Sequence, residues 1–365
     1  MKTILFTYNQ FNYGAMLQAY SLQRTVETIT DGDVVQIDLS DPKDSVREHI
    51  FKKESGSLPV KCILFFLKVL YYQSLKRKWD RIRAFRKKYL HLLKNSPKSI
   101  ADFKISPPEA DLYLVGSDQV FNPKASLRDL YYLNFSVPAK TRCIAYAPSF
   151  GTSDFTSQDE SELKPFLQKF SALSGREESG ADWLKELTGK DVPTLLDPVF
   201  LTTADHWKQI AICPNRPAES YIFVYDLNGG EPLLEIAKRL SRSTGLPVIC
   251  QTEKIYKQYP AKKVFDCGPQ ELIGYISNAA YVVTDSFHGT AFSIIFRKKF
   301  LVYIATKKSQ ERITGILSSL EMQDHMISDI SILPDLNRLS YLNEDSFKNL
   351  QDESLIWLKQ NLIKQ

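Results

Sequence analysis

The residues best suited to chemistry lie in residues 282–291, VVTDSFHGTA, where an apolar strand ends in a polar loop. An imidazole exchanges protons near neutral pH, so His288 is a candidate general acid, and Gly289 leaves room for a ligand beside it. The alternative is a buried histidine held by Asp285 or Ser286. No spacing among the five histidines is typical of a metal site. No ligand cluster in the sequence therefore suggests a metal site, and metal dependence stays open.

A second candidate is Arg176, which follows Gly175 where a strand passes into a helix. The planar guanidinium is suited to binding a carboxylate or a phosphate. The alternative is a surface arginine paired with Glu177 or Glu178, and the residue types alone favour that ion pair. The neighbouring glycine favours an anion site, so both interpretations stay open.

Two further loops carry polar groups at the ends of predicted strands. In residues 12–18, NYGAMLQ, a glycine loop opens a helix whose free N–H groups favour an anion, although such a loop is more often a simple turn. In residues 116–122, GSDQVFN, small and polar residues follow a buried strand, where Ser117 or Asp118 could also cap the next helix. Both loops are candidate binding sites.

The elements that must position these residues alternate between strands and helices. Apolar strands are predicted at 3–7, 34–39, 111–116 and 143–147, and after Asp197-Pro198 again at 221–225, 247–251 and 281–284. Such alternation indicates mainly parallel sheets in two α/β units with a hinge near 198–215. Ligands of such sheets bind beyond the carboxyl ends of the strands, so we expect the site in a cleft between the units.

Residues 58–95 differ in character from the rest of the chain. An apolar run interrupted by Lys61 and Lys68 is too short and too charged to span a membrane, and a strongly basic helical stretch follows it. One interpretation is a helical hairpin packed on the sheet domain with a solvated basic face. The other is peripheral contact with an anionic membrane, with aromatic side chains at the interface.

Composition limits the function classes. A chain of 365 residues with 43% apolar residues can bury two cores, and its net charge of +5 comes largely from one local run, which argues against nucleic acid as a partner. Five scattered cysteines without a CxxC pair predict reduced thiols, and the N-terminus is typical of a strand, so a cytoplasmic location is expected. Walker, GxSxG, HExxH and full GxGxxG motifs are absent from the sequence.

Six segments, taken in order, resemble the polysaccharide pyruvyl transferase family, and they run from about Asn12 to Phe300. They are NYGAMLQAYSLQ, GSDQVFNP, IAYAPSFG, SGREESGADWLKELTG, PTLLDPVFLT and VVTDSFHGTAFSIIF. The resemblance implies an α/β, GT-B-like fold, with two Rossmann-like domains of mainly parallel sheets facing a cleft. We expect an acceptor-side domain at 1–200 with a helical insertion at about 45–100, a donor-side domain at 201–342, and a helix at 343–365 packing back on the body.

The resemblance further implies transfer of the pyruvyl group of phosphoenolpyruvate to a hydroxyl pair of a hexose in a surface glycan precursor, with release of phosphate. Phosphoenolpyruvate is then a co-substrate, and no other cofactor is expected. A polyprenyl-linked acceptor would place the protein peripherally at the inner face of the membrane. The alternatives are a GT-B glycosyltransferase that uses a nucleotide sugar and a glycan-binding protein without activity.

Residue roles follow from matching the family's motifs. The arginine segment reads Ser-Gly-Arg-Glu where Ser-Val-Arg-Glu is commoner, and a further basic residue is expected at Arg312, with Lys307 and Lys308 as rivals. His288 would protonate the methylene carbon of the donor. The implied catalytic residues are His288, Arg176, Asp118 and Asp285; the donor-binding residues are Arg176, Arg312, Ser286, His288, Gly289 and Thr290; the acceptor-binding residues are Asn12, Tyr13, Gly14, Gln18, Ser117, Asp118 and Gln119.

Overall fold

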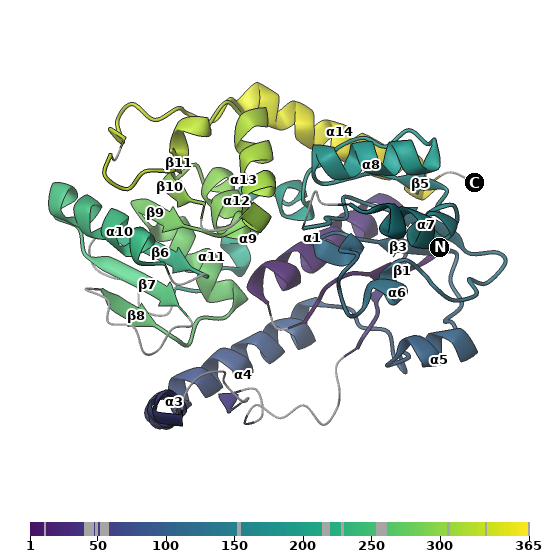
Figure 1. Ribbon diagram of the computed structural model, residues 1–365, viewed down its shortest axis with the longest axis horizontal. Coiled ribbons are helices and arrows are strands. Elements are labelled where there is room, and N and C mark those ends of the chain that lie inside the picture. Colours follow the sequence, from purple (N-terminus) through teal and green to yellow (C-terminus); the bar gives the residue numbers. More distant parts are fainter. Residues whose placement is uncertain are drawn as a thin grey trace. The chain divides into compact units, whose positions relative to one another are not determined.

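The structure is a computed structural model that describes residues 1–10, 12–39, 47, 50–51, 58–151, 155–213, 220–227, 230–252, 261–304, 307–332 and 334–363, with the backbone alone at 58–59 and 307–310. The chain divides into two compact units (Figure 1). The first unit comprises Met1–Asp41, Arg86–Thr202 and Asn343–Gln365, and the second comprises Pro42–Phe85 and Thr203–Leu342.

The first unit contains a parallel sheet in the order β2-β1-β3-β4-β5. Its strands are β1 (Lys2–Phe6), β2 (Asp33–Gln36), β3 (Leu112–Val115), β4 (Arg142–Ala145) and β5 (Ala172–Leu173). Strand β3 is buried at every residue, as expected of a parallel strand covered on both faces. The strand order reverses between β1 and β3, which is the point where open α/β sheets bind ligands.

Helices cover both faces of this sheet. One face packs against α1 (Tyr13–Thr30) and α14 (Glu344–Ile363), and the other packs against α7 (Ser157–Leu167) and α8 (Glu178–Thr188). Shorter elements of the unit are α5 (Ile100–Ile105), η1 (Gln119–Phe121), α6 (Arg128–Tyr131) and η2 (Pro198–Leu201). Leu358 and Leu362 of α14 are buried in the same cluster as Leu22 and Val26 of α1, so the C-terminal helix is part of the first core.

The second unit contains a six-stranded parallel sheet in the order β11-β10-β9-β6-β7-β8. The strands are β6 (Ile222–Asp226), β7 (Val248–Thr252), β8 (Lys262–Val264), β9 (Tyr281–Thr284), β10 (Lys299–Tyr303) and β11 (Met326–Ile327). The helices around it are α9 (Ala204–Ile210), α10 (Glu231–Thr244), α11 (Pro269–Asn278), α12 (Phe287–Ile295), α13 (Lys307–Ser319) and η3 (Gln323–His325). This is the Rossmann strand order, with its reversal between β6 and β9.

The helices α3 (Leu58–Leu70) and α4 (Tyr72–Tyr89) form the helical insertion. The predicted division places this insertion in the first domain, whereas the structure groups residues 42–85 with the second unit. The reason lies in specific contacts: the tilted rings of Tyr71 and Phe265 have their centres 4.9 Å apart, and Arg81 forms ion pairs with Asp266 at 3.2 Å and Glu271 at 3.1 Å. Within the described residues, no helix has the length and apolarity needed to cross a bilayer.

Candidate active-site regions at the two strand reversals

The loop that carries His288 begins at the end of β9 and is fixed to the neighbouring strand. The Thr284 hydroxyl donates to the carbonyl of Tyr225 in β6 at 2.9 Å and accepts from the Ser286 amide at 3.1 Å. Asp285 accepts from the Leu227 amide, just after β6, at 2.9 Å. The polar loop therefore sits at the reversal of the second sheet, tied to both strands that flank it.

Helix α12 starts in this loop, with Ser286 as its N-cap. The Ser286 hydroxyl accepts from the Gly289 amide at 3.3 Å, and the Thr290 hydroxyl donates to the Ser286 carbonyl at 3.0 Å. His288 is the second residue of α12 and is 8% exposed, with its ring edge-on to Phe287 at 5.2 Å. The imidazole thus lies in the first turn of the helix, where the free N–H groups and the helix dipole favour anions.

Gly289 packs closely against the sheet. A Cβ atom at this position would lie 2.4 Å from the Thr284 hydroxyl and 3.0 Å from the ring of Tyr225. The missing side chain therefore lets α12 pack against the sheet. The close contact with Thr284 and Tyr225 gives a packing reason for this glycine, and ligand binding at Gly289 stays a prediction.

Arg312 lies beside the same loop. Its guanidinium carbon is 5.9 Å from the ring centre of Phe287, the residue that opens α12, and its side chain is partly exposed on α13. The structure therefore brings Arg312 together with residues 286–290, as a common donor site requires. The side chains of Lys307 and Lys308, the rival residues, lie outside the described part of the chain.

The first unit places the acceptor candidates at its own strand reversal, between β1 and β3. The Gln18 amide donates to the Thr7 hydroxyl at 2.8 Å, and that hydroxyl donates to the Ser117 carbonyl at 3.3 Å. Asn12 caps α1 by accepting from the Ala15 amide at 3.2 Å. The loop after β1 and the loop after β3 are therefore held together by buried side chains.

Exposure separates the seven acceptor candidates. Tyr13, Gly14, Gln18 and Ser117 are buried, and the Ser117 hydroxyl donates to the Ala147 carbonyl at 2.6 Å. The partly or fully exposed members are Asn12, Asp118 and Gln119. Asp118 accepts from the Gln119 amide at 2.9 Å and keeps 15% of its side chain exposed. The buried four hold the loops in place, and the exposed three have polar groups that a ligand could reach.

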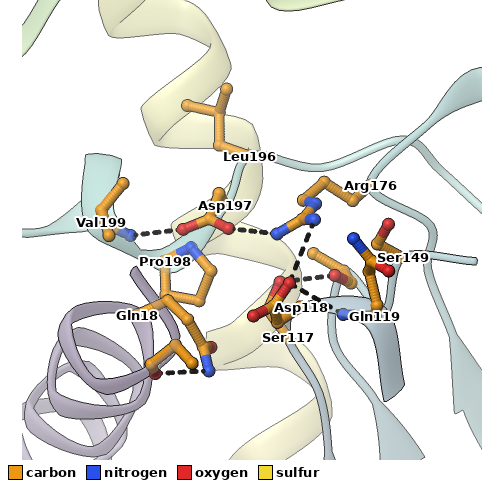
Figure 2. A network of polar contacts seen from close by, with 12 residues as sticks. Gln18, Ser117, Asp118, Gln119, Ser149, Arg176, Leu196, Asp197, Pro198 and Val199 are labelled. Carbon is orange, nitrogen blue, oxygen red and sulfur yellow. Dashed lines mark hydrogen bonds and ion pairs between the residues drawn. The ribbon is translucent and has the colours of Figure 1, made fainter. Parts of the chain in front are cut away.

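Arg176 is the centre of a buried ion-pair network, shown in Figure 2. Its side chain is 3% exposed and lies 2.5 Å from an Asp197 oxygen, 3.5 Å from Glu177 and 3.6 Å from Asp118. Burial alone would lower the pKa of Arg176, but the three carboxylates together outweigh burial and raise it. The guanidinium is therefore charged, and one positive charge faces three negative ones.

This network corrects the simple surface-pair interpretation of Arg176. The predicted partner Glu177 is present, but Asp118 and Asp197 join it and the whole group is buried. Asp197 is itself fixed, since it accepts from the Val199 amide at 3.0 Å, and Glu177 accepts from Ser149 at 2.6 Å. The surplus of negative charge suits hydroxyl donors better than a phosphate or a carboxylate.

Sequence reasoning does not identify three residues of this region. Asp197 has a signal in the motif PTLLDPVFLT, and Ser149 in IAYAPSFG, but neither motif shows that its residue reaches the arginine. Tyr8 follows β1, and burial together with the charge of Asp118 raises its pKa to about 12. Its phenol is therefore protonated at neutral pH and adds a hydroxyl close to Asp118.

The donor candidates are divided between the two units. Arg176 belongs to the first unit, whereas Arg312, Ser286, His288, Gly289 and Thr290 belong to the second. Across the described part of the chain, no group of three or more His, Cys, Asp or Glu side chains is arranged to hold a metal ion. The second strand reversal carries an imidazole and an arginine near a helix N-terminus, and the first carries carboxylates.

Comparison with known proteins gives a family and a fold. A family model described as polysaccharide pyruvyl transferase matches residues 12–306, and no curated protein matches at a significant level. A solved putative UDP-N-acetylglucosamine 2-epimerase from Listeria monocytogenes aligns over 100% of this chain and 97% of its own, with 11% identity and a TM-score of 0.53. An E. coli heptosyltransferase with ADP covers 97% and 100%, with 10% identity and a TM-score of 0.41. At such identity the Listeria match shows the fold alone, a two-domain Rossmann-like GT-B architecture.

Proposed function

Because the chain belongs to the polysaccharide pyruvyl transferase family, we propose that it transfers the pyruvyl group of phosphoenolpyruvate to two hydroxyls of a hexose, with release of phosphate. The acceptor in this proposal is a lipid-linked precursor of a surface glycan. The observation that carries the proposal is the placement of His288 and Arg312 together at the first turn of α12, at the strand reversal of the second sheet.

Phosphoenolpyruvate carries a phosphate and a carboxylate, and the α12 corner offers groups for both. The first-turn N–H groups of α12 favour an anion, and the guanidinium of Arg312 can hold a carboxylate or a phosphate through two hydrogen bonds. Ser286 and Thr290 keep the loop in shape through their hydrogen bonds to the α12 backbone. In this proposal the second unit binds the donor.

His288 then acts as the general acid. The protonated imidazole gives its proton to the methylene carbon of the donor, and the adjacent carbon becomes an oxocarbenium-like centre. One sugar hydroxyl adds to this centre and gives its proton to a carboxylate, from which the imidazole is reprotonated through solvent. The second hydroxyl displaces the phosphate, which takes up the proton of that hydroxyl, and the ketal closes. Arg312 stabilises the negative charge on the departing phosphate, which is electrostatic catalysis by a fixed cation.

We assign the Asp118 region of the first unit to the acceptor. Asp118 can accept hydrogen bonds from sugar hydroxyls and take up a proton from one of them. Arg176 then acts as a positioning residue that holds Asp118 and Asp197, in place of the donor contact that the sequence predicts. The support for this change is charge, since a bound phosphate would meet three carboxylates around the one arginine.

The alternative function is glycosyl transfer from a nucleotide sugar. It is favoured by the strand order of the second sheet, which is the order of dinucleotide-binding domains, with its reversal at β6 and β9. The solved Listeria structure is described as a putative epimerase of a nucleotide sugar, and it shares this fold at 11% identity. Phosphate released from phosphoenolpyruvate is expected only under the first proposal.

The test combines binding and turnover. Calorimetry and thermal unfolding are measured with phosphoenolpyruvate and, separately, with a panel of nucleotide sugars, because a ligand of the native state raises its stability. The His288→Ala variant should lose about 10²–10⁴-fold in phosphate release while keeping the wild-type unfolding temperature. His91→Ala, which removes an exposed histidine, is the matched control. Selective stabilisation by a nucleotide sugar, or wild-type turnover by His288→Ala, would overturn the proposal.

A further inference from the structure

Helix α3 presents an apolar surface that the described chain leaves exposed. The structure describes the α3 side chains at residues 60–70, and none of these side chains is buried. Six of them are apolar and between 46% and 73% exposed: Val60, Ile63, Phe65, Phe66, Val69 and Leu70. Soluble proteins rarely leave so many large apolar side chains together in water, and such a patch marks an interaction surface.

The helix that follows is anchored, so the exposure of α3 does not come from a loose hairpin. Ile82 and Phe85 of α4 are buried, and Arg81 pairs with Asp266 and Glu271. Burial raises the pKa of Glu271, while Arg81 opposes the shift. One side of the hairpin is therefore fixed to the second unit, while α3 keeps its apolar side chains in solvent.

The length of α3 suits a helix that lies at the surface of a membrane, and it is too short for a helix that spans one. Its 13 residues extend about 20 Å at about 1.5 Å per residue, while the hydrocarbon core of a bilayer is about 30 Å thick. Lys61 and Lys68 also interrupt the apolar run. A short helix of this kind can lie in the plane of the headgroups, with its aromatic and aliphatic side chains reaching the acyl boundary.

The charge of the two helices identifies the partner. Residues 58–89 contain ten lysines and arginines and one acidic residue, a net charge of +9, against +5 for the whole chain, so the remaining residues carry −4 in total. A second copy docked through α3 would bring two such basic segments together, which repel each other. An anionic lipid surface attracts them, because each lysine or arginine near the surface adds to binding.

We propose that α3, supported by the basic residues of α3 and α4, docks the protein on an anionic bilayer with the apolar side chains of α3 in the interface. The proposal does not depend on pyruvyl transfer, since it concerns the protein without substrates. Two interactions contribute to the free energy of membrane binding in this proposal. One is the burial of Phe66, Leu70 and their neighbours, and the other is the attraction between the +9 segment and acidic headgroups.

The test is co-sedimentation of the full chain with vesicles of phosphatidylcholine alone and of phosphatidylcholine with 30% phosphatidylglycerol, in about 0.1 M and about 0.5 M salt. We expect binding to the anionic vesicles that weakens at high salt. Phe66→Ser with Leu70→Ser should lower the partition coefficient at least tenfold. Ile105→Ser with Ile332→Ser is the matched control, since these isoleucines are 83% and 73% exposed elsewhere, and it should leave binding unchanged.

A spectroscopic measurement locates the contact. Cys62 is exposed on α3, and Cys213 is half-buried, so a Cys213→Ser protein can carry an environment-sensitive dye at Cys62. We expect a blue shift of its emission on anionic vesicles. Equal binding to neutral vesicles, no binding at all, or full binding by the Phe66 and Leu70 variant would overturn the proposal. A dimer in sedimentation that this variant dissociates would assign the surface to a second copy instead.

Discussion

Replacing Arg176 by methionine tests the buried ion-pair network directly. Methionine keeps much of the apolar stem and removes the charge, so the carboxylates lose their cation. Removing one partner of a buried ion pair costs about 3–5 kcal/mol of unfolding free energy. We assign most of this loss to Asp197 and Glu177, whose side chains are 0% and 5% exposed, and less to Asp118, which is 15% exposed and partly solvated.

Urea unfolding at neutral pH measures the loss. Arg128→Met is the matched control, because Arg128 pairs with Glu162 at 2.9 Å while both side chains are more than a third exposed. We expect it to cost less than about 1 kcal/mol. Adding Asp197→Asn to Arg176→Met should recover about 1–3 kcal/mol, because the double variant no longer buries that unpaired charge. The deficit of Arg176→Met should also shrink as the pH is lowered, since an unpaired buried carboxylate takes up a proton.

Ligand binding decides between a positioning role and a donor contact. If Arg176 only holds Asp118 and Asp197, the folded Arg176→Met protein should bind phosphoenolpyruvate in calorimetry with near wild-type affinity while its turnover falls. Loss of phosphoenolpyruvate binding with an unchanged unfolding free energy would refute the reasoning from charge and restore the donor role that the sequence predicts for Arg176.

Three further predictions concern the second unit and the cysteines. Arg312→Ala should weaken phosphoenolpyruvate binding by at least tenfold in calorimetry, because the guanidinium lies at the α12 corner. The unfolding temperature should not change, because the Arg312 side chain is partly exposed. Unchanged affinity would exclude Arg312 from the donor site. Gly289→Ala should cost about 1–3 kcal/mol in urea unfolding, since the new methyl group meets the Thr284 hydroxyl; an unchanged midpoint would contradict this close packing. Cys62 should react with a thiol reagent in the native protein at pH 8, whereas Cys143 should not, because burial raises the pKa of Cys143 to about 12. The thiolate of Cys143 appears only as the pH rises toward that value. Equal labelling of both cysteines in mass spectrometry would contradict the burial of Cys143.

Much of the fold can be predicted from the sequence because parallel strands leave a local signal. The apolar runs at residues 112–115 and 281–284 end in small and polar residues, and in the structure these are β3 and β9 with their loops at the two strand reversals. The grouping of Arg312 with residues 286–290 came from motif order, and its contact with Phe287 brings it to that loop.

What the sequence does not predict depends on contacts between distant segments. Asp197 lies 21 positions after Arg176 and reaches it only because the two loops meet beside the sheet. Arg81 joins Asp266, 185 positions later in the chain, which moves the helical hairpin from the expected domain to the other unit. Gly289 shows a third limit, since a glycine that admits a ligand and a glycine that admits a neighbouring strand look the same in one sequence.

The place of α14 in the chain sets an order for folding during synthesis. Leu358 and Leu362 complete the cluster that covers one face of the first sheet, yet they are translated after every residue of the second unit. A nascent chain therefore carries Leu22, Val26 and their neighbours without this cover until the second unit has left the ribosome. The first unit is therefore the later of the two to be completed, and partly built cores of this kind are prone to aggregation.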